Sequence, residues 1–204
     1  PLVSSSAASD VYKRQLRDLA AKLRKSRFYV GSLGFEIPEA KIILDDDGVP
    51  VDIKRSVTQE SNHLVEEFML LANRTVAGFV QNMLPRDQDE PPFVYRVHER
   101  PTPEKFSVFA DFVNAIGYPL KTGTRVNGRH LTDFLNAIED KATRSLIERV
   151  LLRSMMKARY DTVSMGHFGL SFRHYSHFTS PIRRYPDLAV HRLLKLYTRN
   201  GWDE

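Results

Sequence analysis

The stretch His177-Phe-Thr-Ser-Pro-Ile-Arg-Arg-Tyr-Pro-Asp-Leu-Ala-Val-His191 predicts a tight turn followed by a helix. Thr179 and Ser180 are residue types that favour helix N-caps, and proline suits a first helical position. Because Pro186 cannot donate a backbone hydrogen bond to a preceding turn, the main helix is expected to begin there. Asn200-Gly201 can close this helix. Its residues form one broad apolar face, made of Ala189, Val190, Leu193, Leu194, Leu196 and Tyr197.

Two adjacent arginines, Arg183 and Arg184, lie beside these predicted helix starts, where the helix dipole disfavours cations. An anion bound at this place would explain them, because exposed amides and guanidinium groups would converge on phosphate oxygens. The alternative is a solvated arginine pair, or an arginine paired with Asp187. The spacing alone leaves both interpretations open.

Length and composition set wide limits on the class of protein. The 204 residues suffice for one domain, or for most of one large domain, with a substantial core. Thirty Lys and Arg against 25 Asp and Glu give a net charge of +5, which is compatible with a polyanionic partner. The absence of cysteine excludes disulfides and thiolate metal sites. No apolar run approaches the ~18–20 residues of a membrane span, and no secretory signal pattern is visible. We therefore expect a cytoplasmic protein with no membrane partner and no obligate protein partner.

The first residues of the chain differ in composition from the predicted helix and strands that follow them. Residues 1–14 contain a Ser/Ala run and are interpreted as a non-native or linker-like segment. Without an initiator Met, the chain is expected to be an internal fragment. From Gln15 a helix is expected, and strand signals follow at 28–30 and 33–37. The apolar face of this helix comprises Leu16, Leu19, Ala20 and Leu23.

A hairpin is predicted next. Lys41–Leu44 and Val49–Ile53 flank Asp47-Gly48, a strong turn signal. The consecutive acids Asp45–Asp47 could suggest a metal site. Acids at a hairpin tip splay outward, however, so we expect them to be solvated.

Residues 60–82 predict the longest helix, with apolar residues nearly all round, as is typical of a helix buried in a large domain. Glu66 and Glu67 are charged exceptions on this apolar helix. As acids near its start, they would be stabilised by the helix dipole. After this helix the sequence predicts a loop at 85–92, a strand at 93–98 and a helix from Thr102-Pro103 to Gly117, whose aromatic stripe is expected to face the core. A basic loop at 121–130 follows, which touches phosphate or faces solvent. Helices at 131–138 and 145–159 and a strand at 165–172 are predicted next.

Three histidines near the C-terminus could suggest zinc. His167, His174 and His177 lie within a short span, but no further ligands occur at suitable spacing. No metal ligand is therefore predicted.

The stretch around the two arginines, with His191-Arg-Leu-Leu after it, resembles the signature of the ribonuclease II / ribonuclease R family of 3′→5′ exoribonucleases, and the ribonuclease R branch most of all. Together the matching motifs span about residues 16–200. The upstream stretches that also fit are Phe35-Glu-Ile-Pro-Glu, Val51-Asp-Ile, Leu64-Val-Glu-Glu-Phe-Met-Leu-Leu-Ala-Asn73, Tyr95-Arg-Val-His-Glu99 and Gly166-His-Phe-Gly-Leu170.

The resemblance implies an α/β (α+β) fold, with a twisted mixed sheet and packed helices around a channel for single-stranded RNA. Residues 15–204 would be the C-terminal portion of an RNB-type catalytic domain. The family is described as using Mg²⁺ held by aspartates that precede this stretch, and residues 15–204 contain no Asp-rich motif to replace them. The intact protein is therefore expected to release nucleoside monophosphates, while the fragment alone is not.

The resemblance also assigns roles to individual residues. Arg183 matches the arginine that contacts the scissile phosphate, Phe35 an aromatic that stacks on the 3′-terminal bases, and Glu67 a carboxylate near the RNA path. An ordinary core position is the alternative for Phe35. Where the family commonly has an acid before this aromatic, the chain has Gly34. The remaining RNA-binding candidates, which shape the arginine turn or contact phosphate, are His177, Thr179, Ser180, Arg184 and Tyr185.

Two other functions remain open. The first is a non-catalytic member of the family that binds RNA, which only the sequence upstream of residue 15 distinguishes from a nuclease. The second is a basic protein-interaction domain, for which binding to single-stranded RNA should lack a steep salt dependence.

Overall fold

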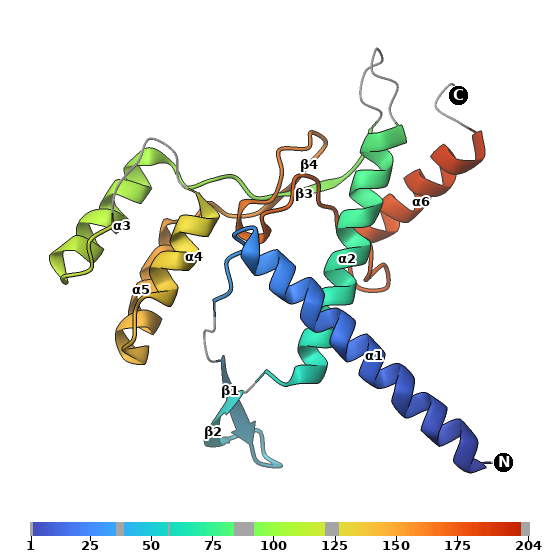
Figure 1. Cartoon of the computed structure of the whole chain (residues 1–204), viewed down its shortest axis with the longest axis horizontal. Coiled ribbons are helices and arrows are strands. Elements are labelled where there is room, and N and C mark those ends of the chain that lie inside the picture. Colours follow the sequence, from blue (N-terminus) through green and yellow to red (C-terminus); the bar gives the residue numbers. More distant parts are fainter. Residues whose placement is uncertain (1, 36–38, 57, 84–91, 121–126, 201–204) are drawn as a thin grey trace.

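The computed structural model describes residues 2–35, 39–56, 58–83, 92–120 and 127–200. Figure 1 shows α3, α4 and α5 grouped at one end and α2 and α6 at the other, with β3 and β4 between them and α1 crossing α2. The elements are α1 (Leu2–Tyr29), β1 (Glu39–Leu44), β2 (Pro50–Ser56), α2 (Glu60–Met83), β3 (Tyr95–Val97), α3 (Pro103–Ala115), α4 (Gly128–Asn136), α5 (Lys141–Ser154), β4 (Arg159–Asp161), the 3-10 helix η1 (Phe168–Leu170) and α6 (Tyr185–Asn200).

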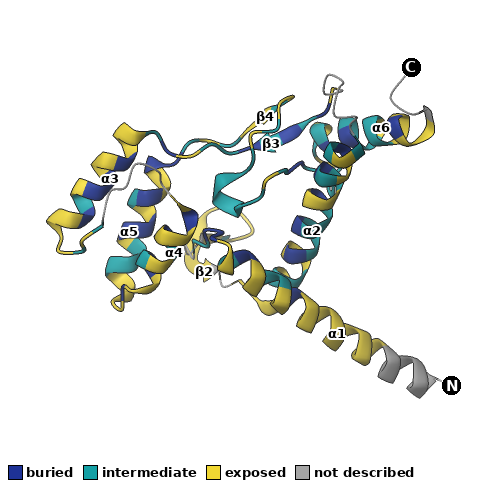
Figure 2. Ribbon diagram, turned by 45° about the horizontal axis from the view of Figure 1, so that its top comes forward, coloured by how far each residue is buried: buried dark blue, intermediate teal, exposed yellow. Residues whose placement is uncertain are grey.

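Two separate hydrophobic clusters stabilise these two groups of helices. Figure 2 shows buried residues on the inward sides of α3, α4 and α5, and again on α2 and β3. The first cluster contains Leu33, Phe106, Phe109, Val113, Leu131, Leu135, Ile138, Ile147, Leu151 and Met155. The second contains Ala77, Val80, Phe93, Tyr95, Val97, Val190 and Tyr197. The aromatic stripe predicted as core in the helix after Thr102 is thus confirmed.

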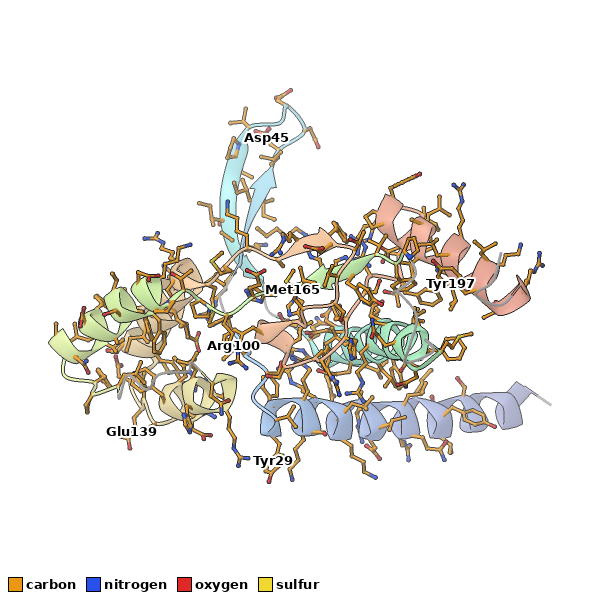
Figure 3. The ribbon with its side chains drawn as sticks, turned by 90° about the horizontal axis from the view of Figure 1, so that it is seen from above. Tyr29, Asp45, Arg100, Glu139, Met165 and Tyr197 are labelled. Atoms are coloured by element: carbon orange, nitrogen blue, oxygen red, sulfur yellow. The ribbon has the colours of Figure 1, made fainter. Side chains whose placement is uncertain are left out.

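The predicted hairpin is confirmed. β1 and β2 pair antiparallel, with Ile42 opposite Ile53, and Gly48 takes the positive φ of 78° that the turn needs. Asp45 Oδ1 accepts hydrogen bonds from the amides of Asp47 and Val49. Figure 3 shows Asp45 at the tip of the hairpin, away from the helices. The acid at the start of this run therefore stabilises the turn.

Three helices begin at side chains that accept a hydrogen bond from the first turn. Thr102 caps α3 through the Lys105 amide, Asn127 caps α4 through that of Arg129, and Asp140 caps α5 through that of Thr143. Gly117, with φ +88°, follows the end of α3 as predicted. The helices after Thr102 and over most of 131–138, 145–159 and 186–200 are confirmed.

The strand predicted at 28–30 is wrong, because Phe28 and Tyr29 form the last turn of α1. The guanidinium groups of Arg24 and Arg27 lie over the Phe28 ring, which accounts for an aromatic side chain on this helix. α1 also begins at Leu2 rather than at Gln15 and, with 28 residues, is longer than α2 with 24. Of its predicted apolar face, Ala20 is buried and Leu23 half-buried, while Leu16 and Leu19 are exposed.

α2 is apolar on one buried side rather than all round. Leu70, Ala77 and Val80 are buried, but Val65 is 54% exposed and Phe79 46% exposed. The helix therefore lies at the surface of the described part of the chain.

The strand predicted at 165–172 is also wrong. Gly166 and Ser171 have φ values of 77° and 54°, which an extended strand does not allow, and the intervening residues form η1. A short strand, β4, occurs instead at Arg159–Asp161 and pairs with β3. The α+β class is confirmed, although the described strands form two small antiparallel sheets rather than one twisted mixed sheet.

Several predicted segments lie partly or wholly outside the described residues. These are the strand at 33–37 beyond residue 35, the loop at 85–92 up to residue 91, the basic loop at 121–130 up to residue 126, the Gly201 closure of the last helix and residues 202–204. Of the basic loop, residues 128–130 form the first turn of α4 instead. In the described ranges, no helix combines the length and apolar character needed to cross a bilayer.

Replacing Ile147 tests the first cluster. Ile147 on α5 is completely buried, so Ile147→Ala should lower the free energy of unfolding by about 2–5 kcal/mol. Its neighbour Leu146 is exposed, and Leu146→Ala should change stability by less than about 0.5 kcal/mol. Urea denaturation of both variants measures the difference. Equal losses would show that α5 is not packed as described.

Candidate nucleic-acid interface

The arginine turn, residues 177–187, is held against α2 by one buried amide side chain. Asn73 Oδ1 accepts hydrogen bonds from the amides of Phe178 at 3.0 Å and Thr179 at 3.2 Å. Its Nδ2 donates to the hydroxyl of Tyr175 at 3.0 Å. The amide oxygen of Asn73 therefore holds the start of the turn, and its nitrogen holds the segment just before it.

Asp187 closes the turn at the start of α6. Its carboxylate is completely buried and accepts hydrogen bonds from the Ser180 amide at 2.8 Å and from Arg184 Nη2 at 2.7 Å. The Ser180 carbonyl accepts from the amides of Arg183 and Arg184. The predicted N-cap role of the Thr179 and Ser180 side chains is therefore not observed, because Asp187 provides the acceptor instead.

These contacts limit the amides that the anion-site hypothesis can use. It requires free amides at the helix start, but the amides of 178, 179, 180, 183 and 184 donate to acceptors within the protein. The tight turn predicted at 181–185 is present, and the Arg183 side chain on it is exposed.

The two arginines differ sharply in their surroundings. Arg184 forms the ion pair with Asp187, so the predicted alternative of pairing is correct for this arginine. Arg183 is exposed and has no ion-pair or hydrogen-bond partner for its side chain among the described residues. Its neighbours Ile182 and Tyr185 are exposed as well. The turn therefore presents one unpaired guanidinium between two exposed hydrophobic side chains.

Buried polar atoms without a partner gather in the same turn. Within the described ranges, the buried side-chain nitrogen and oxygen atoms that lack a hydrogen bond are Thr179 Oγ1, Arg184 Nε and Asp187 Oδ2. Buried polar groups normally have partners, and each orphan requires an explanation such as a water or a ligand. A hydroxyl, a donor and an acceptor within nine residues are suited to a polar ligand or a bound water.

A groove of about 450 Å³ runs from α2 to this turn. Arg184, Tyr175 and Asn73 line one part of it, and Glu66 another. The remaining lining residues, from the N-terminal half of α2, are Ser61, Asn62, Val65, Met69 and Leu70. The groove thus combines apolar walls with a few polar groups, as binding sites commonly do.

His177 lies in a partly enclosed environment near several cations. Burial, the largest cause, and the charges of Arg184, Arg96 and Arg183 together lower its pKa to about 4, although Asp187 acts in the opposite direction. Its Nδ1 lies 2.8 Å from the Tyr160 hydroxyl. The ring is therefore neutral near pH 7. The three arginine charges that act on it create a positive potential at the turn.

Phe35 and Glu67 lie away from the arginine turn. Phe35 is half-buried, follows an irregular segment and packs against the first hydrophobic cluster. Glu67 is 3% exposed, and its carboxylate accepts from Arg27 Nε at 3.2 Å. Because this carboxylate is enclosed, it stabilises the α1–α2 contact; its RNA contact stays a prediction.

Gly34 has a packing reason that the sequence does not reveal. A Cβ at this position would lie 2.5 Å from Cε1 of Phe28. The ring of Phe28 thus occupies the space that a side chain before Phe35 would need. The absence of a side chain at Gly34 therefore makes room for the Phe28 ring.

A magnesium or zinc site does not fit the described residues. No three His, Cys, Asp or Glu side chains in these ranges lie close enough to hold a metal ion. His167 Nδ1 accepts from the Leu170 amide, and His174 Nδ1 lies 2.8 Å from the Ser164 hydroxyl. The ring nitrogens at Nδ1 thus serve local structure.

Sequence reasoning missed three residues that organise this interface: Asn73, Arg27 and Tyr160. Asn73 could have been noticed as a polar residue on the buried side of α2. Arg27 and Tyr160 carry no such signal, because arginine and tyrosine near a helix end or a strand are usually solvated.

Several known proteins are similar to this chain in sequence. A family model described as "RNB domain" matches residues 4–200, a range that includes most of the segment 1–14. Ribonuclease R of Thermotoga maritima is 45% identical over 190 residues, which are 91% of this chain and 26% of that protein. Ribonuclease R of Escherichia coli is 35% identical over 181 residues, covering 89% of this chain and 22% of that protein. The chain thus spans about a quarter of the length of these relatives.

Several solved structures are similar to this chain in fold. Mycoplasma genitalium RNase R in complex with double-stranded RNA has a TM-score of 0.82 at 30% identity and covers 90% of this chain and 32% of its own. The same protein with ribose methylated single-stranded RNA scores 0.82 at 29% identity, with 92% and 28% covered. Yeast Ssd1, described as a pseudonuclease, scores 0.61 at 28% identity, with 72% and 18% covered.

The titration of His177 tests the surroundings of the turn. Since burial disfavours the charged ring, the folded pKa should be about 4 against 6.5 in the unfolded chain. Stability from the neutral ring is present above pH 6.5 and is lost as the pH falls toward 4. NMR titration of the ring protons in folded protein, with urea-unfolded protein as control, measures both values. A folded midpoint near the unfolded one would contradict the enclosed, cationic environment.

Proposed function

The chain belongs to the RNB-domain family, as its motifs predict, and on that premise we propose that it forms part of a 3′→5′ exoribonuclease. The substrate is single-stranded RNA, the products are nucleoside monophosphates, and the protein acts in cytoplasmic RNA degradation. Residues 15–204 are the C-terminal portion of the catalytic domain. Relatives of similar fold include a ribonuclease R in complex with RNA, which supports RNA as the ligand.

The arginine turn carries this proposal. The unpaired Arg183, the three buried orphan atoms and the cationic environment of His177 all occur within residues 177–187. A phosphate oxygen satisfies an unpaired guanidinium, and a ribose or phosphate group offers both acceptors and donors. The three orphan atoms call for a partner, which a polar ligand or a bound water provides.

In this function, Arg183 donates hydrogen bonds to the nonbridging oxygens of the scissile phosphate. Donors already held in place where charge develops lower the barrier, typically by a few kcal/mol. Arg184 is held by Asp187 and orients the turn. The remaining RNA contacts at the turn are Thr179, Ser180, His177 and Tyr185.

Phe35 stacks on the 3′-terminal bases, which suits an enzyme that accepts every sequence, because each base has an aromatic face. Glu67 lies near the RNA path but acts through its pair with Arg27. The groove beside Arg184 and Tyr175 is wide enough to receive part of a nucleotide strand.

Mg²⁺ belongs to the intact protein in this proposal. The described residues do not fit a magnesium site, so no hydrolytic step is assigned to them. Their contribution is to bind and orient the RNA end. The chain by itself is accordingly expected to bind RNA without cleaving it.

A non-catalytic RNA-binding protein is the second candidate. The lack of a carboxylate cluster among the described residues and the similarity to Ssd1, a pseudonuclease, favour it. Closely spaced aspartates upstream of residue 15 in the reading frame would decide for the nuclease.

Arg183→Ala in the intact protein tests the assignment of the phosphate contact. Turnover of a short RNA should fall roughly 100-fold, as for the loss of one donor to a developing charge, whereas RNA affinity should fall much less. Arg199→Ala, on the exposed last turn of α6, is the control and should leave both unchanged. Rapid-quench cleavage and filter binding measure the two quantities. Equal losses in turnover and affinity would exclude a transition-state role.

The salt dependence of RNA binding distinguishes a nucleic-acid interface from a basic protein-interaction domain. Each phosphate contact should contribute about −0.7 to the slope of log affinity against log salt concentration for single strands. Fluorescence anisotropy with a labelled single-stranded RNA, over a series of salt concentrations, measures the slope. A slope near zero would support the protein-interaction alternative.

A further inference from the structure

One buried guanidinium joins the two predicted RNA contacts that lie outside the arginine turn. Arg27, near the end of α1, is 6% exposed. Its Nε donates to Glu67 Oε1 at 3.2 Å and Oε2 at 3.3 Å, and its Nη2 also donates to Oε1. Its Nη1 donates to Ser32 Oγ at 2.8 Å. A single side chain thus binds α2 on one edge and the segment 32–35 on the other.

The segment 32–35 is anchored at its start and carries Phe35 at its end. Ser32 is completely buried, and its amide donates to the Arg27 carbonyl at 3.1 Å. Its hydroxyl lies 3.3 Å from the carbonyl oxygen of Gly169, which also accepts from the Leu33 amide at 2.8 Å. Three residues after Ser32 comes Phe35, so a shift of the anchor moves the aromatic ring.

Only an arginine can make both connections from this position. Its planar fork offers five N–H donors in fixed directions, whereas a lysine ammonium is a point charge on a flexible stem. Lysine could still pair with Glu67, but it would lose the simultaneous contact with Ser32. Arg27→Lys therefore removes the contact with Ser32 and keeps the positive charge beside Glu67.

We propose that Arg27 is a positioning residue for the RNA 3′ end: through Ser32 it sets the place of Phe35, and through Glu67 it holds the α2 carboxylate near the RNA path. This inference rests on the proposed function. Arg27 itself touches neither RNA nor a reacting atom, because its side chain is buried between Glu67 and Ser32.

A double-mutant cycle on the intact protein tests the proposal. RNA carrying 2-aminopurine at its 3′ terminus reports stacking by fluorescence quenching, and EDTA prevents cleavage during the titration. Phe35→Ala should abolish the quenching and weaken binding roughly tenfold, the size of a base–aromatic stack. Arg27→Lys should lose part of the same quenching, and the double variant should lose no more than Phe35→Ala alone.

Arg24→Lys is the matched control. Arg24 lies one turn earlier on α1, and its guanidinium also covers Phe28. It lies 3.1 Å from His63 Nδ1 and 3.9 Å from the Glu66 and Glu67 carboxylates, so a lysine keeps the charge there, and the described hydrogen bonds of Ser32 do not involve it. It should bind and quench like the unchanged protein. If thermal unfolding shows that Arg27→Lys does not fold, Ser32→Ala takes its place in the cycle. Ser32→Ala removes the contact between Arg27 and Ser32 and leaves the ion pair between Arg27 and Glu67.

The outcomes separate the two proposals. Quenching by Arg27→Lys equal to that of Arg24→Lys, or additive effects of Arg27→Lys and Phe35→Ala, would overturn the positioning role alone. If the variants show the expected cycle but the unsubstituted protein releases no nucleotide when Mg²⁺ is added, the nuclease proposal is overturned and the role of Arg27 is retained. An unchanged protein that binds no RNA would overturn both.

Discussion

The buried ion pair between Arg27 and Glu67 is the constraint on which the N-terminal half depends. Both groups lie almost out of contact with solvent, and removing one partner of such a pair typically costs about 3–5 kcal/mol because the other charge is left uncompensated. α1 offers α2 few apolar side chains, since Leu16 and Leu19 are exposed. The crossing of α1 and α2 therefore depends on charge pairing as much as on packing, and the segment with Phe35 is attached to the same pair.

A second buried carboxylate, Asp187, has the corresponding role in the C-terminal half. It binds the Ser180 amide and Arg184, so the start of α6 is closed by an acceptor from the protein itself. This closure decides what the turn can offer to a ligand. The amides of 178, 179, 180, 183 and 184 are occupied, whereas the side chain of Arg183 is exposed and has no partner among the described residues.

Local patterns were good predictors wherever the interactions are local. The Asp47-Gly48 hairpin, the Thr102 cap and the last helix depend on residues within a few positions of one another, and all three are present. The errors concern two segments that were predicted as strands. The 28–30 segment is rich in strand-forming residues, but it is helical and Phe28 is covered by Arg24 and Arg27. The 165–172 segment lacks strand geometry because Gly166 and Ser171 adopt positive φ.

By itself, the sequence determined the family, the α+β class and the stretch that carries the two arginines, because these follow from motifs and from short-range periodicity. Only the tertiary structure decided which of the two arginines is exposed, and that Glu67 is enclosed by Arg27. Arg184 and Asp187 lie three residues apart, and their pairing was one of the interpretations that the sequence left open. Arg27 and Glu67, by contrast, lie 40 residues apart in the chain. No periodic pattern encodes such a pairing, since it is set by which charged groups lose their water together when distant elements pack.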